Sequence, residues 1–207
     1  MAGLSETRLR HGGLKHLFHW THLDNLPGIA AEGAVLSKAE LERRSLWPCA
    51  RPGGDDLSHD LDRRFGTWGF VSTSPITRTP MLTRRVDEEW PLCLIAIDLQ
   101  VADLPGVEFT DKNAASAQSR RMPAPEGLEL LDYEALCRPP EPPSLFWMQK
   151  ILPRLQSEVL VPRQVERRFI REIVVPDRQS VVEVRGRWQE GGPVIRVAPD
   201  MFPRGRR

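Results

Sequence analysis

Two segments far apart in the chain carry residue types that can do acid–base chemistry. The first, at residues 19–25, puts two histidines, a hydroxyl and an Asp-Asn pair where an apolar strand is expected to turn into a helix. The second, at 156–161, places one carboxylate, Glu158, in a stretch typical of a buried strand. A histidine-rich strand end that faces a lone carboxylate predicts a cleft for a polar ligand, with an acid or base at its floor.

A metal site is the first alternative, because His16, His19 and His22 recur at every third position. Side chains alternate along a strand, so His19 and His22 would point to opposite faces. In addition, no set of cysteines or carboxylates completes a zinc site, and we therefore expect no metal. Histidines that simply pack in the core remain an open interpretation of His19 and His22.

The composition favours one compact protein that needs no disulfide cross-links. With 207 residues and a net charge of +1, we expect a single domain over residues 1–207. Cys49, Cys93 and Cys137 are odd in number and widely spaced, which argues against a disulfide framework and fits a reducing cytoplasm. The longest apolar run, 92–99, has the length of a strand, so we expect neither a membrane span nor a signal peptide.

Arginines recur in pairs, and the chain has no glycine-rich device for binding phosphates. The pairs could follow the backbone of a nucleic acid, although a solvated surface balanced by acidic residues explains them equally well. Gly12-Gly13 and Gly53-Gly54 fit neither a phosphate loop nor a dinucleotide fingerprint. A bound nucleotide would therefore be held by other means. The pairs include Arg43-Arg44, Arg63-Arg64, Arg84-Arg85 and Arg120-Arg121.

Periodicity and cap residues indicate a mixed α+β chain. We expect strands at 15–21, 68–73, 92–99, 107–110, 158–161 and 169–175, with weaker candidates at 181–184 and 194–197. We expect helices from Asp24-Asn25 to Gly33 and at 37–46, 80–89, 113–121 and 128–136. The almost wholly apolar run 92–99 is typical of a central strand covered on both faces. Residues 48–62 are expected to be a loop, and the proline-rich stretch 138–143 a stiff linker.

Six short motifs follow one another over almost the whole chain. They are His19-x-Thr21-His22-x-Asp24-Asn25-Leu26, Glu42-Arg43-Arg44, Gly53-Gly54 with His59, Arg78-Thr79-Pro80-Met81-Leu82, Phe109-Thr110-Asp111, and Gln156-Ser157-Glu158-Val159-Leu160-Val161. In this order they resemble the DarT family, bacterial toxins that ADP-ribosylate a base in single-stranded DNA with NAD+ as donor. The resemblance implies an α+β fold like that of ADP-ribosyltransferases, with split central β-sheets flanked by helices.

The resemblance also implies which residues are catalytic. Glu158 would take the proton from the acceptor nitrogen, and Arg44 would lie against the acceptor base, where a fixed guanidinium stabilises developing charge. A glutamate at a strand edge and an arginine on a helix surface are the structural alternatives.

The same resemblance assigns the binding residues. The NAD+ co-substrate would be held by His19, Thr21, Asn25, Leu26 and Arg44, and the nucleic acid by Arg43, Arg78 and His59. Asp24-Asn25 is also suited to capping a helix, and Arg78 to a plain surface role. Three tryptophans are candidates for stacking on a base or for core packing: Trp47, Trp68 and Trp147.

The function implied is that of an NAD+-dependent mono-ADP-ribosyltransferase of single-stranded DNA, a cytoplasmic toxin in a toxin–antitoxin or phage-defence system. Its expected partner is a macrodomain antitoxin similar to DarG. A base inside a duplex cannot reach a catalytic carboxylate, so the acceptor must be single-stranded or extruded.

Two alternatives stay open. The segment 62–75 is longer than its counterpart in the family, and its Ser72-Thr73-Ser74 is similar to a strand of protein-modifying ADP-ribosyltransferases. This feature favours transfer to protein or RNA. The other alternative is an inactive module that binds NAD+ or nucleic acid.

Overall fold

The structure is a computed structural model that describes residues 2–137, 144, 146–188 and 191–202. The expected linker at 138–143 lies outside these residues. The strands are β1 (Leu17–His22), β2 (Ala34–Leu36), β3 (Phe70–Thr73), β4 (Leu92–Ile97), β5 (Glu108–Thr110), β6 (Arg121–Pro123), β7 (Val159–Pro162), β8 (Gln164–Glu166), β9 (Ile170–Val175) and β10 (Val194–Val197). The α-helices are α1 (Leu4–His11), α2 (Leu26–Glu32), α3 (Lys38–Arg43), α4 (Asp56–Arg64), α5 (Pro80–Asp87), α6 (Tyr133–Cys137) and α7 (Arg178–Trp188).

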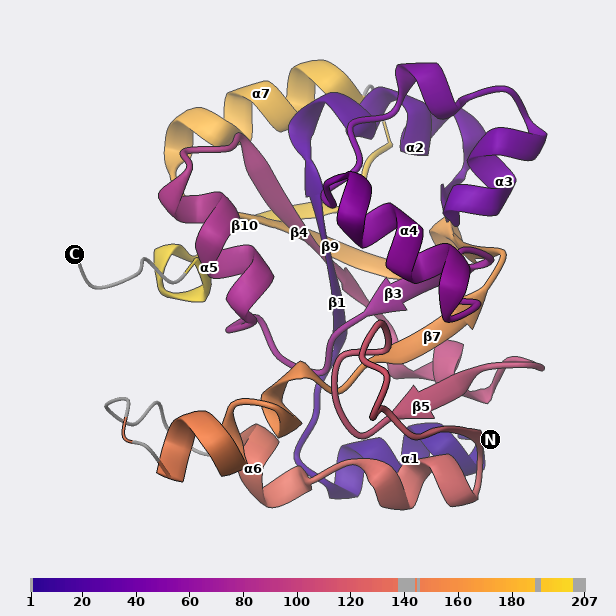
Figure 1. Cartoon of the computed structure of the whole chain (residues 1–207). Helices are drawn as coiled ribbons and strands as arrows, with labels where there is room; N and C mark the ends of the chain where they lie inside the picture. The colour runs from indigo at the N-terminus through magenta and orange to yellow at the C-terminus, as the bar shows by residue number, and fades with distance from the viewer. Residues whose placement is uncertain (1, 138–143, 145, 189–190, 203–207) are drawn as a thin grey trace.

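The described part of the chain forms two four-stranded sheets and one two-stranded sheet (Figure 1). The first sheet has the strand order β1-β4-β9-β10, and the second has the order β3-β7-β5-β6. All pairs in these two sheets are antiparallel except β9 with β10. The small sheet pairs β2 with β8. Helices α2 and α7 pack against each other at one end of the molecule, and α1 and α6 lie at the opposite end (Figure 1).

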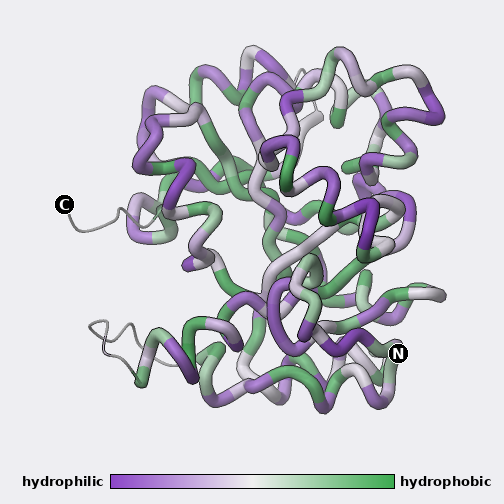
Figure 2. Tube along the Cα trace, in the orientation of Figure 1, coloured by the Kyte–Doolittle hydropathy of each residue, from purple (hydrophilic) through white to green (hydrophobic). Residues whose placement is uncertain are grey.

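β4 is the central strand that its apolar sequence predicts. Every one of its residues is buried, because β1 and β9 flank it and both faces of the sheet are covered. Its side chains alternate between two hydrophobic clusters, so that Ile95 packs in one and Leu94 in the other. The strands through the middle of the molecule are accordingly hydrophobic, whereas hydrophilic residues gather on the outer helices and loops (Figure 2).

The two large sheets are joined at one point. Phe18 in β1 and Ser74, just after β3, exchange two backbone hydrogen bonds of 2.8 Å. β1 otherwise pairs with β4 and β3 with β7, so the two strands separate on leaving this bridge. The separation leaves polar groups of β1 and β3 facing a gap between the sheets.

Cap residues set the limits of the helices beside this gap. Gly33 ends α2 with φ of 62°, a left-handed conformation in which a side chain would be strained. Ser37 begins α3, since its hydroxyl accepts a hydrogen bond of 3.3 Å from the Glu40 amide. β2 connects the two helices and packs against both.

Four expected elements were wrong. Instead of one helix at 128–136, the chain forms a 3₁₀ helix (Glu126–Leu130) and the short helix α6, with a break between them. Residues 56–64 form helix α4 instead of a loop, because Asp55 accepts a hydrogen bond of 3.0 Å from the Ser58 amide and so caps a helix. Residues 113–120 form turns and irregular structure instead of a helix, and Arg121 begins β6. The Asn113 side-chain oxygen accepts a hydrogen bond from the Ala115 amide and draws the backbone into a polar turn. Residues 181–184 lie within α7 and not in a strand. Among the described residues, no helix has both the length and the hydropathy needed to cross a bilayer.

Candidate active site

A cavity of about 550 Å³ fills the gap where β1 and β3 separate. This volume lies within the range of small-molecule binding sites. β1 and β3 contribute to its wall, together with α2, β2, the start of α3, the segment 46–54, residues 113–115 and the approach to β7. Among its lining residues are His19, Thr21, Asn25, Ser72 and Glu158. The predicted convergence of the histidine-rich strand end and the distant carboxylate is thus seen in the structure.

Glu158 lies just before β7 and is fixed by both its backbone and its side chain. Its backbone amide donates to the Thr110 hydroxyl at 2.9 Å, and its carbonyl accepts from the Thr110 amide at 2.9 Å. Its carboxylate accepts hydrogen bonds from the Ser72 hydroxyl and from the Ala114 amide, the latter at 3.2 Å. Burial raises the pKa of Glu158 to about 7, despite these two hydrogen bonds, which act to lower it. A carboxylate with that pKa is suited to accept a proton near neutral pH.

His19 is held in one tautomer. Its Nδ1 lies 3.0 Å from the Ser72 carbonyl oxygen, and since a carbonyl can only accept, Nδ1 carries the hydrogen. Burial lowers the pKa of His19, so the ring is neutral at pH 7. Its Nε2 is therefore left as a hydrogen-bond acceptor. Ser72 joins the two groups, because its carbonyl bonds His19 and its hydroxyl bonds Glu158.

Replacing Ser72 with alanine should raise the pKa of Glu158 above 7. The reason is that burial raises this pKa, whereas the hydrogen bond from the Ser72 hydroxyl stabilises the charged carboxylate and lowers it. Without the hydroxyl, the effect of burial increases. A carbon-13 NMR titration of the Glu158 carboxyl measures the shift. Ser74→Ala is the matched control, since the Ser74 hydroxyl bonds the Ile76 amide instead. An unchanged titration in Ser72→Ala would show that this hydrogen bond has no influence on the carboxylate.

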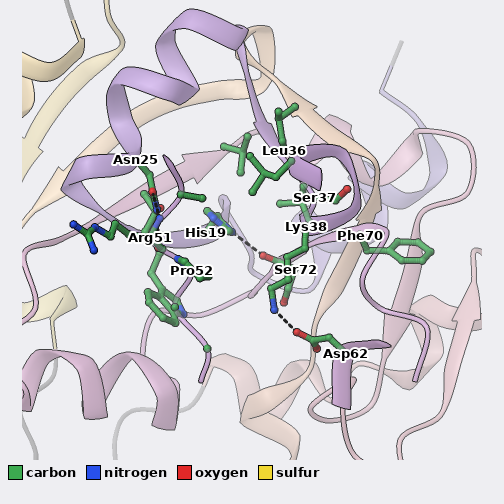
Figure 3. A pocket seen from close by; sticks show the side chains of 18 of the residues that line it. His19, Asn25, Leu36, Ser37, Lys38, Arg51, Pro52, Asp62, Phe70 and Ser72 are labelled. Atoms are coloured by element: carbon green, nitrogen blue, oxygen red, sulfur yellow. Dashed lines mark hydrogen bonds and ion pairs between the residues drawn. The ribbon is translucent and has the colours of Figure 1, made fainter. Parts of the chain in front are cut away.

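Asn25 fastens the segment 49–54 at the cavity (Figure 3). Its side-chain amide donates to the Thr21 hydroxyl and to the Arg51 carbonyl, both at 2.9 Å, and its Oδ1 accepts from the Arg51 amide at 2.7 Å. Both amide hydrogens are thereby used within the protein. Asn25 and Thr21 thus position this wall of the cavity.

Gly53 holds the same segment against the body of the protein. A Cβ at this position would lie 2.0 Å from the Trp20 ring. The Gly53 carbonyl accepts two hydrogen bonds from the buried Arg85 guanidinium, at 2.7 and 3.0 Å. The segment therefore approaches the body in a way that only a glycine permits.

Gly53→Ala is expected to destabilise the protein by about 1–3 kcal/mol, because the new methyl group must displace either the Trp20 ring or the Arg85-bound backbone. Thermal unfolding measures the loss, and hydrogen exchange at residues 49–54 localises it. Gly186→Ala on α7 is the control, since a Cβ there meets nothing within 4 Å and should add about 1 kcal/mol of stability. Equal stability of Gly53→Ala and the wild type would contradict the close approach.

Helix α4 supplies the wall opposite α2. Ser58 and Asp62 line the cavity, whereas His59 is not among the lining residues. The His59 ring packs edge-on against Trp47 and Trp68, with ring centres 5.5 and 5.8 Å apart. Trp47 also lines the cavity, and the indole of Trp68 donates a hydrogen bond of 2.8 Å to Glu42. His59 and Trp68 thus attach α4, and the assignment of His59 to nucleic-acid binding stays a prediction.

The structure does not bring Arg44 into the cavity lining. Its guanidinium contacts Glu32 at 2.6 Å, Gln164 at 2.8 Å and Glu40 at 3.4 Å. These contacts occupy its three nitrogens between α2, α3 and β8. Arg43 bonds Glu40 at 2.7 Å and is otherwise exposed. The catalytic and binding roles expected of the two arginines stay predictions.

Two further expected binding residues lie apart from the cavity lining. Leu26 is fully buried in the hydrophobic core at the start of α2. Arg78 is exposed beside a second cavity of about 1140 Å³, which Lys15 and Trp147 also line. Contact of Leu26 with NAD+ and of Arg78 with nucleic acid stay predictions.

The regularly spaced histidines separate, as strand alternation predicts. The Nδ1 of His22 accepts a hydrogen bond of 3.0 Å from the Asp24 amide, and the ring packs edge-on against Trp90 at 5.7 Å. Within the described ranges, no group of three histidine, cysteine or acidic residues approaches closely enough to hold a metal ion.

Two lining residues that face each other, Lys38 and Asp62, were not expected from the sequence. Asp62 was assigned to a loop. One signal for Lys38 was available, because a lysine at the first position of a helix opposes the helix dipole and calls for another explanation.

The sequence is similar to those of known DNA ADP-ribosyltransferases. A sequence model described as "ssDNA thymidine ADP-ribosyltransferase, DarT" matches residues 18–203. A DNA ADP-ribosyl transferase–DNA ADP-ribosyl glycohydrolase fusion protein of Thermosipho africanus (strain H17ap60334) is 26% identical over 175 aligned residues, and the match covers 80% of this chain and 43% of that protein.

Solved structures share the fold. Thermosipho africanus DarTG in complex with ADP-ribose superposes with a TM-score of 0.72 at 23% identity, over 91% of this chain and 51% of that one. Thermus sp. 2.9 DarT in complex with ADP-ribosylated ssDNA gives 0.71 at 22% identity, over 92% and 97%. The same DarT in complex with NAD+ gives 0.68 at 20% identity, over 91% and 98%. The chain spans about half the length of the fusion proteins that it matches.

These likenesses confirm the expected α+β fold with split sheets, and they confirm the family that the six motifs indicated. Since the family model covers almost the whole chain, the protein belongs to the DarT family of ssDNA thymidine ADP-ribosyltransferases.

Proposed function

We propose that this chain is an NAD+-dependent mono-ADP-ribosyltransferase that modifies a base in single-stranded DNA. The observation that carries the proposal is the arrangement in the cavity, where Glu158, with a pKa of about 7, and the neutral His19 are joined through Ser72. Family membership supports the substrate class, as do the solved DarT complexes with NAD+ and with ADP-ribosylated ssDNA.

The reaction breaks the bond between the ribose C1′ and the nicotinamide nitrogen and forms a bond from C1′ to a nitrogen of the acceptor. Nicotinamide leaves with the bonding electron pair and becomes neutral, so the transition state resembles an oxocarbenium ion, as in glycoside hydrolysis. Within this scheme, the free Nε2 of His19 accepts a hydrogen bond from a ribose hydroxyl. The Glu158 carboxylate faces the developing positive charge and takes the proton that the acceptor nitrogen releases.

The remaining assignments are part of the proposal. Thr21 and Asn25 hold the wall against which NAD+ binds, with Leu26 beneath it. Arg44 would contact NAD+ if its guanidinium left the ion pair with Glu32 and bound the ligand instead. The backbone of the single strand would be contacted by the exposed Arg43 and Arg78 and by the half-buried His59, and binding would weaken steeply with salt.

We also infer one domain over residues 1–207 and a cytoplasmic location, which the three free cysteines support. The partner we infer is a macrodomain antitoxin that removes the modification, since the Thermosipho africanus relative carries a DNA ADP-ribosyl glycohydrolase in the same chain.

The test is incubation of the protein with labelled NAD+ and separate pools of single-stranded DNA, RNA and lysate protein. Label is expected in the DNA, and mass spectrometry of a short oligonucleotide identifies the modified base. Transfer to protein or RNA remains the alternative, because Ser72-Thr73-Ser74 is similar to a strand of protein-modifying ADP-ribosyltransferases and the Ser72 hydroxyl contacts Glu158. Label in protein alone would reject the DNA acceptor, and a wild type that releases no nicotinamide would indicate a binding module.

A further inference from the structure

Lys38 and Asp62 face each other in the wall of the cavity (Figure 3). Lys38 is the first residue of α3, and Asp62 comes from α4, so their ion pair links two separate elements. Their side chains are only 25% and 20% exposed. The Lys38 ammonium also lies 5.2 Å from the centre of the Trp68 ring, which holds it from a second side.

The charge of Lys38 acts on both ends of the proposed reaction centre. It lowers the pKa of His19 and that of Glu158, whereas the charge of Asp62 raises the pKa of Glu158. The Lys38 ammonium therefore acts electrostatically on both His19 and Glu158. An acceptor base bound in this cavity would have Glu158, Lys38 and Asp62 in the wall around it.

Among the residues that the structure describes, two cationic side chains line the cavity, Lys38 and Arg51. Arg51 is 68% exposed and reaches toward Asp24 at 3.9 Å. Arg44, the expected partner of the acceptor base, is absent from the lining and is engaged by Gln164 and by the lining residue Glu32. Lys38, at 25% exposure, is thus the more enclosed of the two lining cations.

We propose that Lys38 is a catalytic residue that recognises the acceptor base. Its ammonium donates a hydrogen bond to a carbonyl oxygen beside the ring N–H of the base. As Glu158 removes that proton, negative charge spreads from the ring nitrogen to the carbonyl oxygen, where Lys38 stabilises it while the nitrogen attacks C1′. Asp62 positions the ammonium. This inference rests on the proposed function and selects bases with a ring N–H flanked by a carbonyl, such as thymine.

The test compares Lys38→Met with Lys150→Met, a matched loss of one lysine charge at an exposed position that lines neither cavity. With saturating thymine-containing oligonucleotide, Lys38→Met should lower kcat for transfer by about 10²- to 10³-fold, the usual effect of removing one preorganised donor. Its KM for NAD+ and its release of nicotinamide in the absence of DNA should change little. Lys150→Met should transfer at the wild-type rate.

A second acceptor separates charge stabilisation from folding. The N3–H of 5-fluorouracil is more acidic than that of thymine, so its anion needs less stabilisation at the carbonyl oxygen. With an oligonucleotide that contains 5-fluorouracil, the kcat for transfer of Lys38→Met should therefore lie closer to that of the wild type. Lys38→Arg keeps the positive charge and should retain most of the transfer. Wild-type transfer by Lys38→Met would overturn the inference, as would an equal loss of transfer and of nicotinamide release. Absence of all NAD+ cleavage in the wild type would instead refute the proposed function itself.

Discussion

Replacing Glu158 with glutamine should lower the rate of ADP-ribose transfer to single-stranded DNA by about 10²- to 10⁴-fold. An amide has nearly the same shape and can keep the hydrogen bonds with Ser72 and Ala114, but it cannot accept the proton of the acceptor nitrogen. Single-turnover transfer to a labelled oligonucleotide measures the loss. Glu126→Gln is the control, because Glu126 is exposed at the start of a 3₁₀ helix and lines neither cavity. A rate within tenfold of the wild type would remove Glu158 from the proposed chemistry.

The pH dependence gives this prediction a second readout. Only the carboxylate form of Glu158 can take the proton, and its pKa is about 7. The wild-type kcat/KM should therefore rise between pH 6 and 8 and level above that range. Glu158→Gln should show a low rate without this rise. A wild-type rate that is constant over the same interval would show that Glu158 is not the titrating group.

The central sheet and the two key polar groups of the site could be predicted from the sequence. Residues 92–99 are apolar throughout, and such a run is stable only when both faces are covered. His19 and Glu158 were recognised for the converse reason, since a polar side chain within an apolar strand needs a function or a partner. Their approach to the same cavity follows from β1 and β3 meeting at a single bridge.

The wall formed by α4 could not be predicted in this way. The Pro52-Gly53-Gly54 sequence indicates a loop, and a helix of nine residues has little stability of its own. Contacts distant in sequence hold it in place, for example the hydrogen bond of 2.5 Å that the Arg63 guanidinium donates to Glu42, 21 residues earlier in the chain. The Lys38–Asp62 pair depends on this packing, so no local pattern could reveal it.

The position of Arg44 was uncertain from the sequence for the same reason. The motif places the arginine near the end of α3, but the residues that attract its guanidinium lie elsewhere. Glu32 ends α2, and Gln164 begins β8, which is 120 residues further along the chain. Ion pairs follow spatial proximity and not sequence order, so a motif can identify the residue without giving the direction of its side chain.

Glu158→Gln should also make the protein more stable at alkaline pH, by about 3 kcal/mol above pH 8. The pKa of Glu158 is raised from 4.5 to about 7, so the folded protein favours the protonated carboxyl. Below pH 4.5 the carboxyl is neutral in both the folded and the unfolded state, and the variant should match the wild type. As the pH rises through 7, the wild type must bury a charge and loses stability that the amide retains. Urea unfolding at pH 4, 6 and 8 measures the difference.

Glu40→Gln provides the comparison of opposite sign. The pKa of Glu40 is lowered to about 2 by hydrogen bonds and charge from Arg43 and Arg163, so its charged form is favoured in the folded state. Glu40→Gln should therefore be less stable than the wild type at pH 7, and the difference should disappear as the pH falls toward 2. If the stabilities of Glu158→Gln and Glu40→Gln relative to the wild type instead change with pH in the same direction, the buried charge of Glu158 does not destabilise the folded state. If Glu158→Gln is more stable than the wild type but transfers more slowly, then the raised pKa that lets Glu158 act as a base is maintained at the expense of stability.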